Sequence, residues 1–144
     1  MERNKVFIDT NVFVAELTND DSLHDRALRL IARIEGMGMH EVTSNAVISE
    51  TITILSQRVA KKTALIFADF IYGNEANVEI ITVDRHIEDE ALKYFHKAKS
   101  KNISFCDCTT LAILKEYGLA QIATFDSDFK KAKGSIKGDY TVLN

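Results

Sequence analysis

Acidic side chains at distant positions of the chain could meet in one pocket and act on a phosphate ester. Asp9 directly follows a short apolar run, so we expect it at the carboxyl end of a buried strand, where ligands bind in an open parallel α/β sheet. Asp126 follows a later strand in the same way, and Asp128 lies beside it. Glu50 is expected one turn into a helix and Asp107 in the first turn of another. The candidate catalytic acids are therefore Asp9, Glu50, Asp107 and Asp126, with Asp128 as a further metal-binding candidate.

Carboxylates that share one pocket require a divalent cation, because each ionised group raises the pKa of the others. Oxygen ligands without supporting His or Cys favour the hard ions Mg²⁺ and Mn²⁺. Such an ion can lower the pKa of a water molecule and stabilise the leaving oxygen of a phosphodiester. We therefore expect hydrolysis that leaves a 5′-phosphate and a 3′-hydroxyl, without a protein nucleophile.

Each acid also has a purely structural interpretation. Asp9 could cap a helix, and the acids after the fourth expected strand could be turn residues. Ser104 lies three residues before Asp107, which is the spacing of a capping box. However, Asp107 falls on the helix face expected to be buried, where an acid needs a partner or a metal. Glu50 could be a solvated helix residue, and Asp84, which also follows a strand, is assigned to helix capping because no other acid converges on it.

The segments between these acids alternate between strand and helix. We expect strands at about 5–8, 41–44, 78–83, 122–124 and 140–143, and helices at about 11–17, 23–35 (after Ser22 as N-cap), 45–59, 62–72, 85–99 and 105–117, with an acidic turn at 125–129. This order predicts a parallel sheet with helices on both faces. The first and fourth strands can be neighbours at a switch point, which would bring Asp9 and Asp126 together.

The composition is that of one soluble globular domain over residues 1–144. The chain is 46% hydrophobic and holds no apolar run near the roughly 20 residues of a membrane span. The start of the sequence lacks a secretory pattern, and the spacing of Cys106 and Cys108 favours free thiols, so we expect a cytoplasmic protein. The net charge of −3 argues against a polyanionic partner, but removing the five candidate acids from the 21 Asp and Glu leaves 16 against 18 Lys and Arg. The remaining surface is mildly basic and compatible with a nucleic acid.

Four motifs resemble, in order and spacing, the acidic motifs of PIN-domain nucleases: residues 7–13, 49–50, 105–112 and 123–129. The chain length is similar to that of the VapC-type toxins of prokaryotic toxin-antitoxin pairs. The resemblance implies that the four catalytic candidates bind metal and that Asp128 occupies an auxiliary acidic position. It also implies a set of supporting polar residues: Thr10, Asn11, Ser49 and Thr124.

The same resemblance predicts the fold, activity and partners. It implies a single PIN-like domain with a five-stranded parallel sheet, and cleavage of single-stranded or structured RNA with Mg²⁺ or Mn²⁺. It further implies a cognate antitoxin that masks the site or a nearby apolar groove. We therefore expect a metal-dependent endoribonuclease that acts as the toxin of a type II pair.

Several other functions stay open at this point. A PIN-like nuclease could process RNA outside a toxin pair, and a non-catalytic module could bind metal only for stability or dimerisation. A haloacid-dehalogenase-like phosphatase needs a second acid two residues after Asp9, where this chain has Asn11. A receiver domain needs paired acids after the first strand and a phosphoacceptor after the third, and neither is present among the candidates.

Basic and apolar residues suggest where partners bind. RNA phosphates could meet a set of cationic side chains: Arg58, Lys61, Lys62, Lys97, Lys99, Lys101, Lys130, Lys131 and Lys133. Two apolar helix faces could form a homodimer or belong to the ordinary core. These faces are Ile48, Ile52, Leu55 and Val59, and Ile66, Phe67, Phe70 and Ile71.

Overall fold

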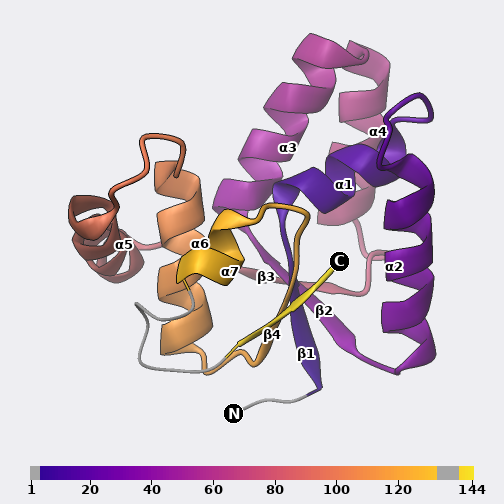
Figure 1. Cartoon of the computed structure of the whole chain (residues 1–144). Coiled ribbons are helices and arrows are strands. Elements are labelled where there is room, and N and C mark those ends of the chain that lie inside the picture. The colour runs from indigo at the N-terminus through magenta and orange to yellow at the C-terminus, as the bar shows by residue number, and fades with distance from the viewer. Residues whose placement is uncertain (1–3, 133–139) are drawn as a thin grey trace.

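The computed structural model describes residues 4–132 and 140–144, which form alternating strands and helices (Figure 1). Lys133, one of the expected cationic contacts, lies outside the described residues. The elements are β1 (Lys5–Ile8), α1 (Thr10–Leu17), α2 (His24–Gly36), β2 (His40–Ser44), α3 (Asn45–Arg58), α4 (Lys61–Tyr72), β3 (Val78–Ile81), α5 (Arg85–Lys97), α6 (Phe105–Glu116), β4 (Gln121–Ala123), α7 (Asp128–Ala132) and β5 (Thr141–Leu143).

The strands form one five-stranded sheet in the order β3-β2-β1-β4-β5, and every neighbouring pair is parallel. The chain moves from β1 outward to β3 and then returns to β4 on the other side of β1. Right-handed crossovers therefore place the helices on both faces of the sheet. In Figure 1, α1, α2 and α4 lie on one side and α5, α6 and α7 on the other. The expected parallel sheet is confirmed, and the first and fourth strands, which could be neighbours in such a sheet, do pair.

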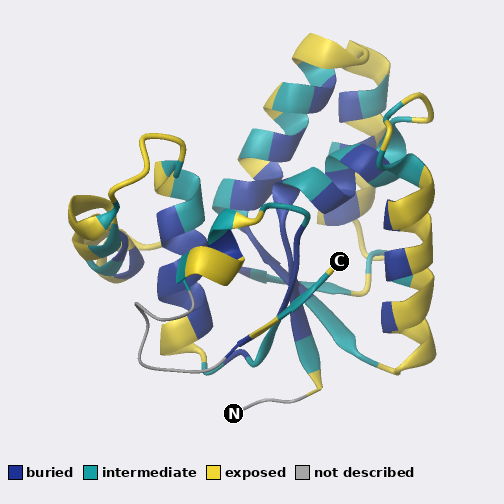
Figure 2. Ribbon diagram, in the orientation of Figure 1, coloured by how far each residue is buried: buried dark blue, intermediate teal, exposed yellow. Residues whose placement is uncertain are grey.

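The core lies between the sheet and these two helix layers (Figure 2). Phe7, Ile8 and Ile122 of the central strands are fully buried, as is Ile113 of α6. Helix α6 is buried from Cys108 to Leu114, so it is the central helix of its layer. No helix of the described part of the chain is long and apolar enough to cross a membrane.

The two apolar helix faces are mostly core. Ile48 and Leu55 of α3 are fully buried, and Phe67 and Ile71 of α4 are nearly so. Val59, Ile66 and Phe70 are exposed, and Ile52 is partly buried against the core. The core interpretation therefore holds for the centre of each face, and only its flank is left for a partner.

Side-chain caps start the helices that carry the candidate acids. Ser44 accepts from the N–H of Val47 at the start of α3 (3.1 Å). Ser104 accepts from the N–H of Asp107 at the start of α6, and Asp107 Oδ2 accepts from the N–H of Ser104, both at 3.0 Å. The expected capping box is confirmed, with Asp in place of the usual Glu or Gln.

Three expected boundaries were wrong for local reasons. Helix α2 begins at His24 with Leu23, not Ser22, as its N-cap, because Asp21 Oδ1 accepts from the N–H of Leu23 in a preceding turn. Strand β3 ends at Ile81 because the N–H of Val83 donates to the Asn45 side chain (2.7 Å). The expected acidic turn contains a short helix, α7, which starts at Asp128.

Candidate active site

Asp9 lies between the ends of β1 and β4, at the switch point of the sheet. Successive strands are added on one side of β1 up to β3, and on its other side from β4 onward. Its N–H donates to the carbonyl oxygen of Ala123 (3.1 Å), and the residue is only 3% exposed. Asp9 Oδ1 accepts from the N–H of Thr10 (2.8 Å) and caps α1. The capping interpretation is therefore correct for one carboxylate oxygen, while the other points to the residues that follow β4.

Thr124 connects Asp9 to the segment after β4. Its hydroxyl donates to Asp9 Oδ2 (2.8 Å) and accepts from Asn11 Nδ2 and from the N–H of Asp126, both at 3.1 Å. Asn11 Oδ1 accepts from the N–H of Phe125 (3.0 Å). These bonds fix the first turn of α1 against the segment that carries Asp126, so the positions of the two acids are coupled.

The four acids from separate parts of the chain line one cleft of about 280 Å³, which we call the acid cleft. Its acids are Asp9, Glu50, Asp107 and Asp126. Asp9 and Asp126 follow the adjacent strands β1 and β4, while α3 supplies Glu50 and the first turn of α6 supplies Asp107. The cleft thus lies at the switch point of the sheet, the position at which α/β proteins bind ligands.

Burial and the charges of neighbouring acids make protonation of Asp9 and Asp107 easier. Burial raises the pKa of Asp9 to about 7; the hydrogen bond from Thr124 opposes this rise, and the charges of Asp107 and Glu50 add to it. Burial also raises the pKa of Asp107, against the hydrogen bonds from Ser104, and the charges of Asp126 and Glu50 raise it further. A cation in the cleft would favour the ionised form of both carboxylates.

The donor chemistry of the acid cleft fits a hard divalent cation. All four acids offer oxygen, and Thr10, which also lines the cleft, has a buried hydroxyl without a hydrogen-bond partner among the described residues. In the described ranges, no group of three or more His, Cys, Asp or Glu side chains is close enough to hold a metal ion. The acids thus share a cleft without forming a closed ligand set, and metal binding is a proposal that the donor chemistry supports.

Three of the expected site residues do not line the acid cleft. Thr124 is fully buried and reaches the site through its hydrogen bond to Asp9. Ser49 is exposed on α3. Asp128 begins α7 and lines a different hollow, where its carboxylate lies 3.7 Å from Lys131 Nζ. Its own N–H donates to Asp126 Oδ1 (2.9 Å), so Asp128 orients an acid of the cleft through its backbone.

Three further residues contribute to the acid cleft. Arg58, expected only as one of many phosphate contacts, lines the cleft at the end of α3. Ser104 lines it too, beyond its capping role, and the capping-box spacing to Asp107 could have revealed this. The thiol of Cys106 is hydrogen-bonded to Glu50, and burial with the nearby acids raises its pKa. No sequence signal distinguished Cys106 from Cys108.

Comparisons with known proteins point in one direction. The PIN domain family matches residues 6–135. The 23S rRNA-specific endonuclease VapC20 of Mycobacterium tuberculosis is 31% identical over 127 residues, which cover 88% of this chain and 93% of that protein. Its crystal structure, described as a sarcin-ricin loop cleaving toxin, superposes with a TM-score of 0.79 at 28% identity and covers 88% of this chain and 94% of that one.

A more distant structure shares the fold. VapBC2 from Rickettsia felis, bound to a DNA fragment from its promoter, gives a TM-score of 0.64 at 17% identity, over 97% of this chain and 99% of that one.

Proposed function

Because the chain belongs to the PIN-domain family and is a VapC-type endoribonuclease toxin, we propose that its acid cleft binds Mg²⁺ or Mn²⁺ and hydrolyses RNA with it. One observation carries the proposal: four carboxylates from four separate segments line a single cleft at the switch point of the sheet. A bound cation would supply an activated water and neutralise charge on the phosphate. We propose ribosomal RNA as the substrate, since the relative acts on 23S rRNA.

Hydrogen bonds within the protein orient the carboxylates that would bind the cation. Thr124 and Thr10 each donate to one oxygen of Asp9, which fixes the plane of its carboxylate. The backbone N–H of Ser104 likewise donates to Asp107 Oδ2 and helps to orient that carboxylate. Arg58 is the basic residue among the described lining of the acid cleft, and its guanidinium can attract an RNA phosphate to an otherwise negative site.

A cleavage assay tests the proposal. Purified 23S rRNA should be cut by the protein with Mg²⁺ or Mn²⁺, should stay intact with EDTA, and should be cut again when the metal is restored. The products should carry 5′-phosphates and 3′-hydroxyls, which ligation and labelling can identify. Undiminished cleavage in EDTA would overturn the metal requirement. Stabilisation by metal without cleavage of any RNA pool would favour the alternative of a non-catalytic module.

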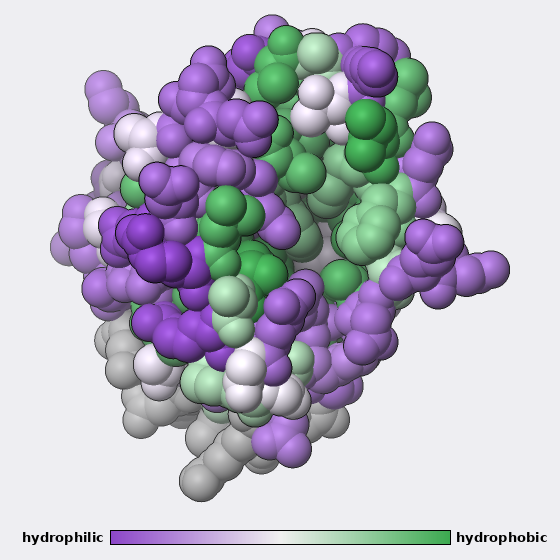
Figure 3. All heavy atoms as spheres, turned by 90° about the vertical axis from the view of Figure 1, so that its right-hand side faces the viewer, coloured by the Kyte–Doolittle hydropathy of each residue, from purple (hydrophilic) through white to green (hydrophobic). Residues whose placement is uncertain are grey.

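We propose that a cognate antitoxin binds an acidic groove on the opposite side of the molecule from α5 and α6. The groove, of about 610 Å³, lies between α1, α2 and α4, where Figure 3 shows apolar side chains around a hollow with a hydrophilic rim. Its apolar wall includes Phe13, Phe67 and Phe70. Four glutamates also line the groove: Glu16, Glu35, Glu41 and Glu75.

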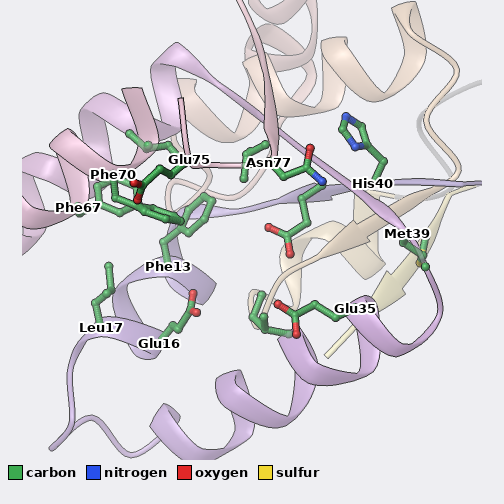
Figure 4. A pocket seen from close by; sticks show the side chains of 15 residues that line it. Phe13, Glu16, Leu17, Glu35, Met39, His40, Phe67, Phe70, Glu75 and Asn77 are labelled. Atoms are coloured by element: carbon green, nitrogen blue, oxygen red, sulfur yellow. The ribbon is translucent and has the colours of Figure 1, made fainter. Parts of the chain in front are cut away.

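The glutamates make the groove selective for a basic segment. In Figure 4 the carboxylates of Glu16 and Glu35 project into the same hollow as the rings of Phe67 and Phe70. Burial raises the pKa of Glu16, and the charges of Glu41 and Glu35 raise it further. A partner helix with one apolar face and several Lys or Arg would cover the rings and relieve this crowding.

Charge reversal at the rim of the acidic groove should weaken antitoxin binding. The double variant Glu35→Arg with Glu75→Arg changes two exposed groups, so the fold should be kept, and like-charge contact should raise the Kd about tenfold or more. The probe is the small protein encoded directly upstream, measured by titration calorimetry. Glu88→Arg, on the exposed face of α5, is the matched control. Equal affinity of both variants and wild type would contradict this assignment.

We also propose that the chain forms a homodimer through the free flank of α4. Leu65 and Tyr72 are seven residues apart, so they lie on the same face of the helix, and both are more than half exposed. Phe70 lies on the other flank, toward the acidic groove. Light scattering at micromolar concentration should show a dimer for wild type and a monomer for Leu65→Lys. A wild-type monomer throughout this range would contradict the proposal.

An RNA substrate would be met in the cytoplasm, where we propose that the protein acts. We further propose that residues 1–144 form one PIN-like domain, of which the family match covers residues 6–135. Action outside a toxin pair is the alternative, and the gene order around this chain would distinguish the two.

A further inference from the structure

We infer that a second hollow, next to the acid cleft, binds one nucleotide of the RNA substrate beside the scissile phosphate. This lysine hollow, of about 400 Å³, lies between the end of α5, the segment 98–103, α6 and α7. Three of its lining residues are lysines: Lys97, Lys99 and Lys131. The inference rests on the proposed function, because it names how the same RNA is held.

The lysine hollow and the acid cleft are lined by neighbouring residues of the same segments. Ile103 lines the hollow, and the next residue, Ser104, lines the cleft. Asp107 and Leu111 lie four residues apart on α6, which separates them by about 6 Å along the helix; the first lines the cleft and the second the hollow. A strand with its phosphate in the cleft therefore reaches the hollow with the adjacent nucleotide.

The residues that precede and begin α7 also place the acid cleft next to the lysine hollow. The N–H of Asp128 donates to Asp126 Oδ1 (2.9 Å), and each of these acids lines one of the two spaces. Helices α5, α6 and α7 lie on the same side of the sheet (Figure 1). The two spaces are thus neighbours rather than separate features of the surface.

The chemistry of the lysine hollow matches a nucleotide. Its volume is within the range of small-molecule sites. Ile103 and the ring of Tyr94, both partly exposed, offer apolar surface to a base, and the buried Leu111 completes the wall behind them. Three lysines against the single acid Asp128 give an excess of positive charge for phosphate, on a protein whose net charge is −3.

Asp128 gives the lysine hollow a means of selecting the base. Its carboxylate is half-buried beside Lys131 (3.7 Å) and can accept hydrogen bonds from N–H groups on a base edge. This explains an acid that lies two residues from the cleft without lining it. The lysines would set affinity, whereas Asp128 would set base preference.

Binding measured without metal separates this inference from catalysis. We would follow a fluorescent RNA fragment of 23S rRNA by anisotropy in EDTA, with Lys97→Ala and Lys99→Ala combined. The Kd should rise about tenfold or more, and the slope of log Kd against log salt should fall by about 1.4 to 1.8 for the two lost contacts. Lys93→Ala, one turn earlier on α5 and paired with Glu90, is the matched control and should bind as wild type does. Circular dichroism should show unchanged melting for these exposed lysines.

The outcomes are distinguishable. Equal RNA affinity of the double lysine variant, Lys93→Ala and wild type, or no RNA binding by wild type, would overturn the inference. Lysine-dependent binding by a wild-type protein that cuts no RNA with Mg²⁺ or Mn²⁺ would retain the binding site and overturn the proposed function alone.

A second readout tests the role of Asp128. Binding of oligonucleotides with one randomised position at a time should reveal a base preference next to the cleaved bond. Asp128→Asn should flatten or change that preference at one position only, while Lys97→Ala with Lys99→Ala should weaken all sequences equally. An unchanged preference in Asp128→Asn would overturn its part in base selection.

Discussion

Asp9→Asn is expected to lower RNA cleavage by at least about 10²-fold, because it removes a charge at the centre of the acid cleft. The fold should be kept, since the Asn oxygen can still accept from the N–H of Thr10 at the start of α1 and Asn is as good an N-cap as Asp. Initial rates on 23S rRNA with saturating Mg²⁺ measure the loss. Circular dichroism measures whether the fold is retained.

Asp84→Asn is the matched control for this substitution. Asp84 also follows a parallel strand, β3, and caps the next helix through the N–H of Ile87 (3.0 Å), but it does not line the acid cleft. Asn is an equally good cap, so activity should equal that of wild type. A fully active Asp9→Asn protein would remove Asp9 from the chemistry and contradict the assignment of the cleft.

The second large effect is the dependence of stability and metal affinity on pH. The pKa of Asp9 in the folded, metal-free protein is about 7, above the value of about 3.9 in an unfolded chain. The folded state therefore binds a proton that the unfolded state has lost, and stability should fall as the pH rises from about 4 through 7. The loss is on the order of a few kcal/mol. A cation competes with the same proton, so its affinity should weaken about tenfold for each pH unit below 7.

Thermal melts at pH 5.5 and pH 8 test both the pH dependence of stability and the pH dependence of metal affinity. Metal-free wild type should melt at a higher temperature at pH 5.5, and saturating Mn²⁺ should raise the melting temperature more at pH 8. Burial also raises the pKa of Glu16 and Glu41 in the acidic groove, which gives a pH dependence of the same sign. The difference between wild type and Asp9→Asn isolates the contribution of Asp9. Identical pH dependence in the two proteins would contradict the role given to Asp9.

The sheet and the meeting of the acids were predictable because both follow from buried strands. The apolar runs before Asp9 and before Asp126 are the central strands β1 and β4, and parallel strands bring their carboxyl ends to one edge. The order of elements allows the two strands to be neighbours, and the structure shows that they are. Helical acids are harder to place, since only the helix face expected to be buried marks Asp107 as more than a capping residue, and nothing local marks Glu50.

The rest depends on tertiary structure that local patterns do not encode. Proximity in sequence and the family resemblance place Asp128 with Asp126, whereas in the structure Asp128 begins the five-residue helix α7 and the two acids line different spaces. The acidic groove combines Glu16, Glu35 and Glu41, which come from α1, α2 and β2 and look like ordinary surface charges in the sequence. Which exposed apolar residues remain on α4 likewise depends on which neighbours cover it.

The most direct test is a crystal structure of the protein soaked in Mn²⁺, with anomalous data collected to locate the ion. We predict an anomalous peak inside the acid cleft, with carboxylate oxygens of Asp9 and at least one of the other three acids as ligands. Mn²⁺ at millimolar concentration that leaves this cleft without a peak, while the acids keep their places, would contradict the account.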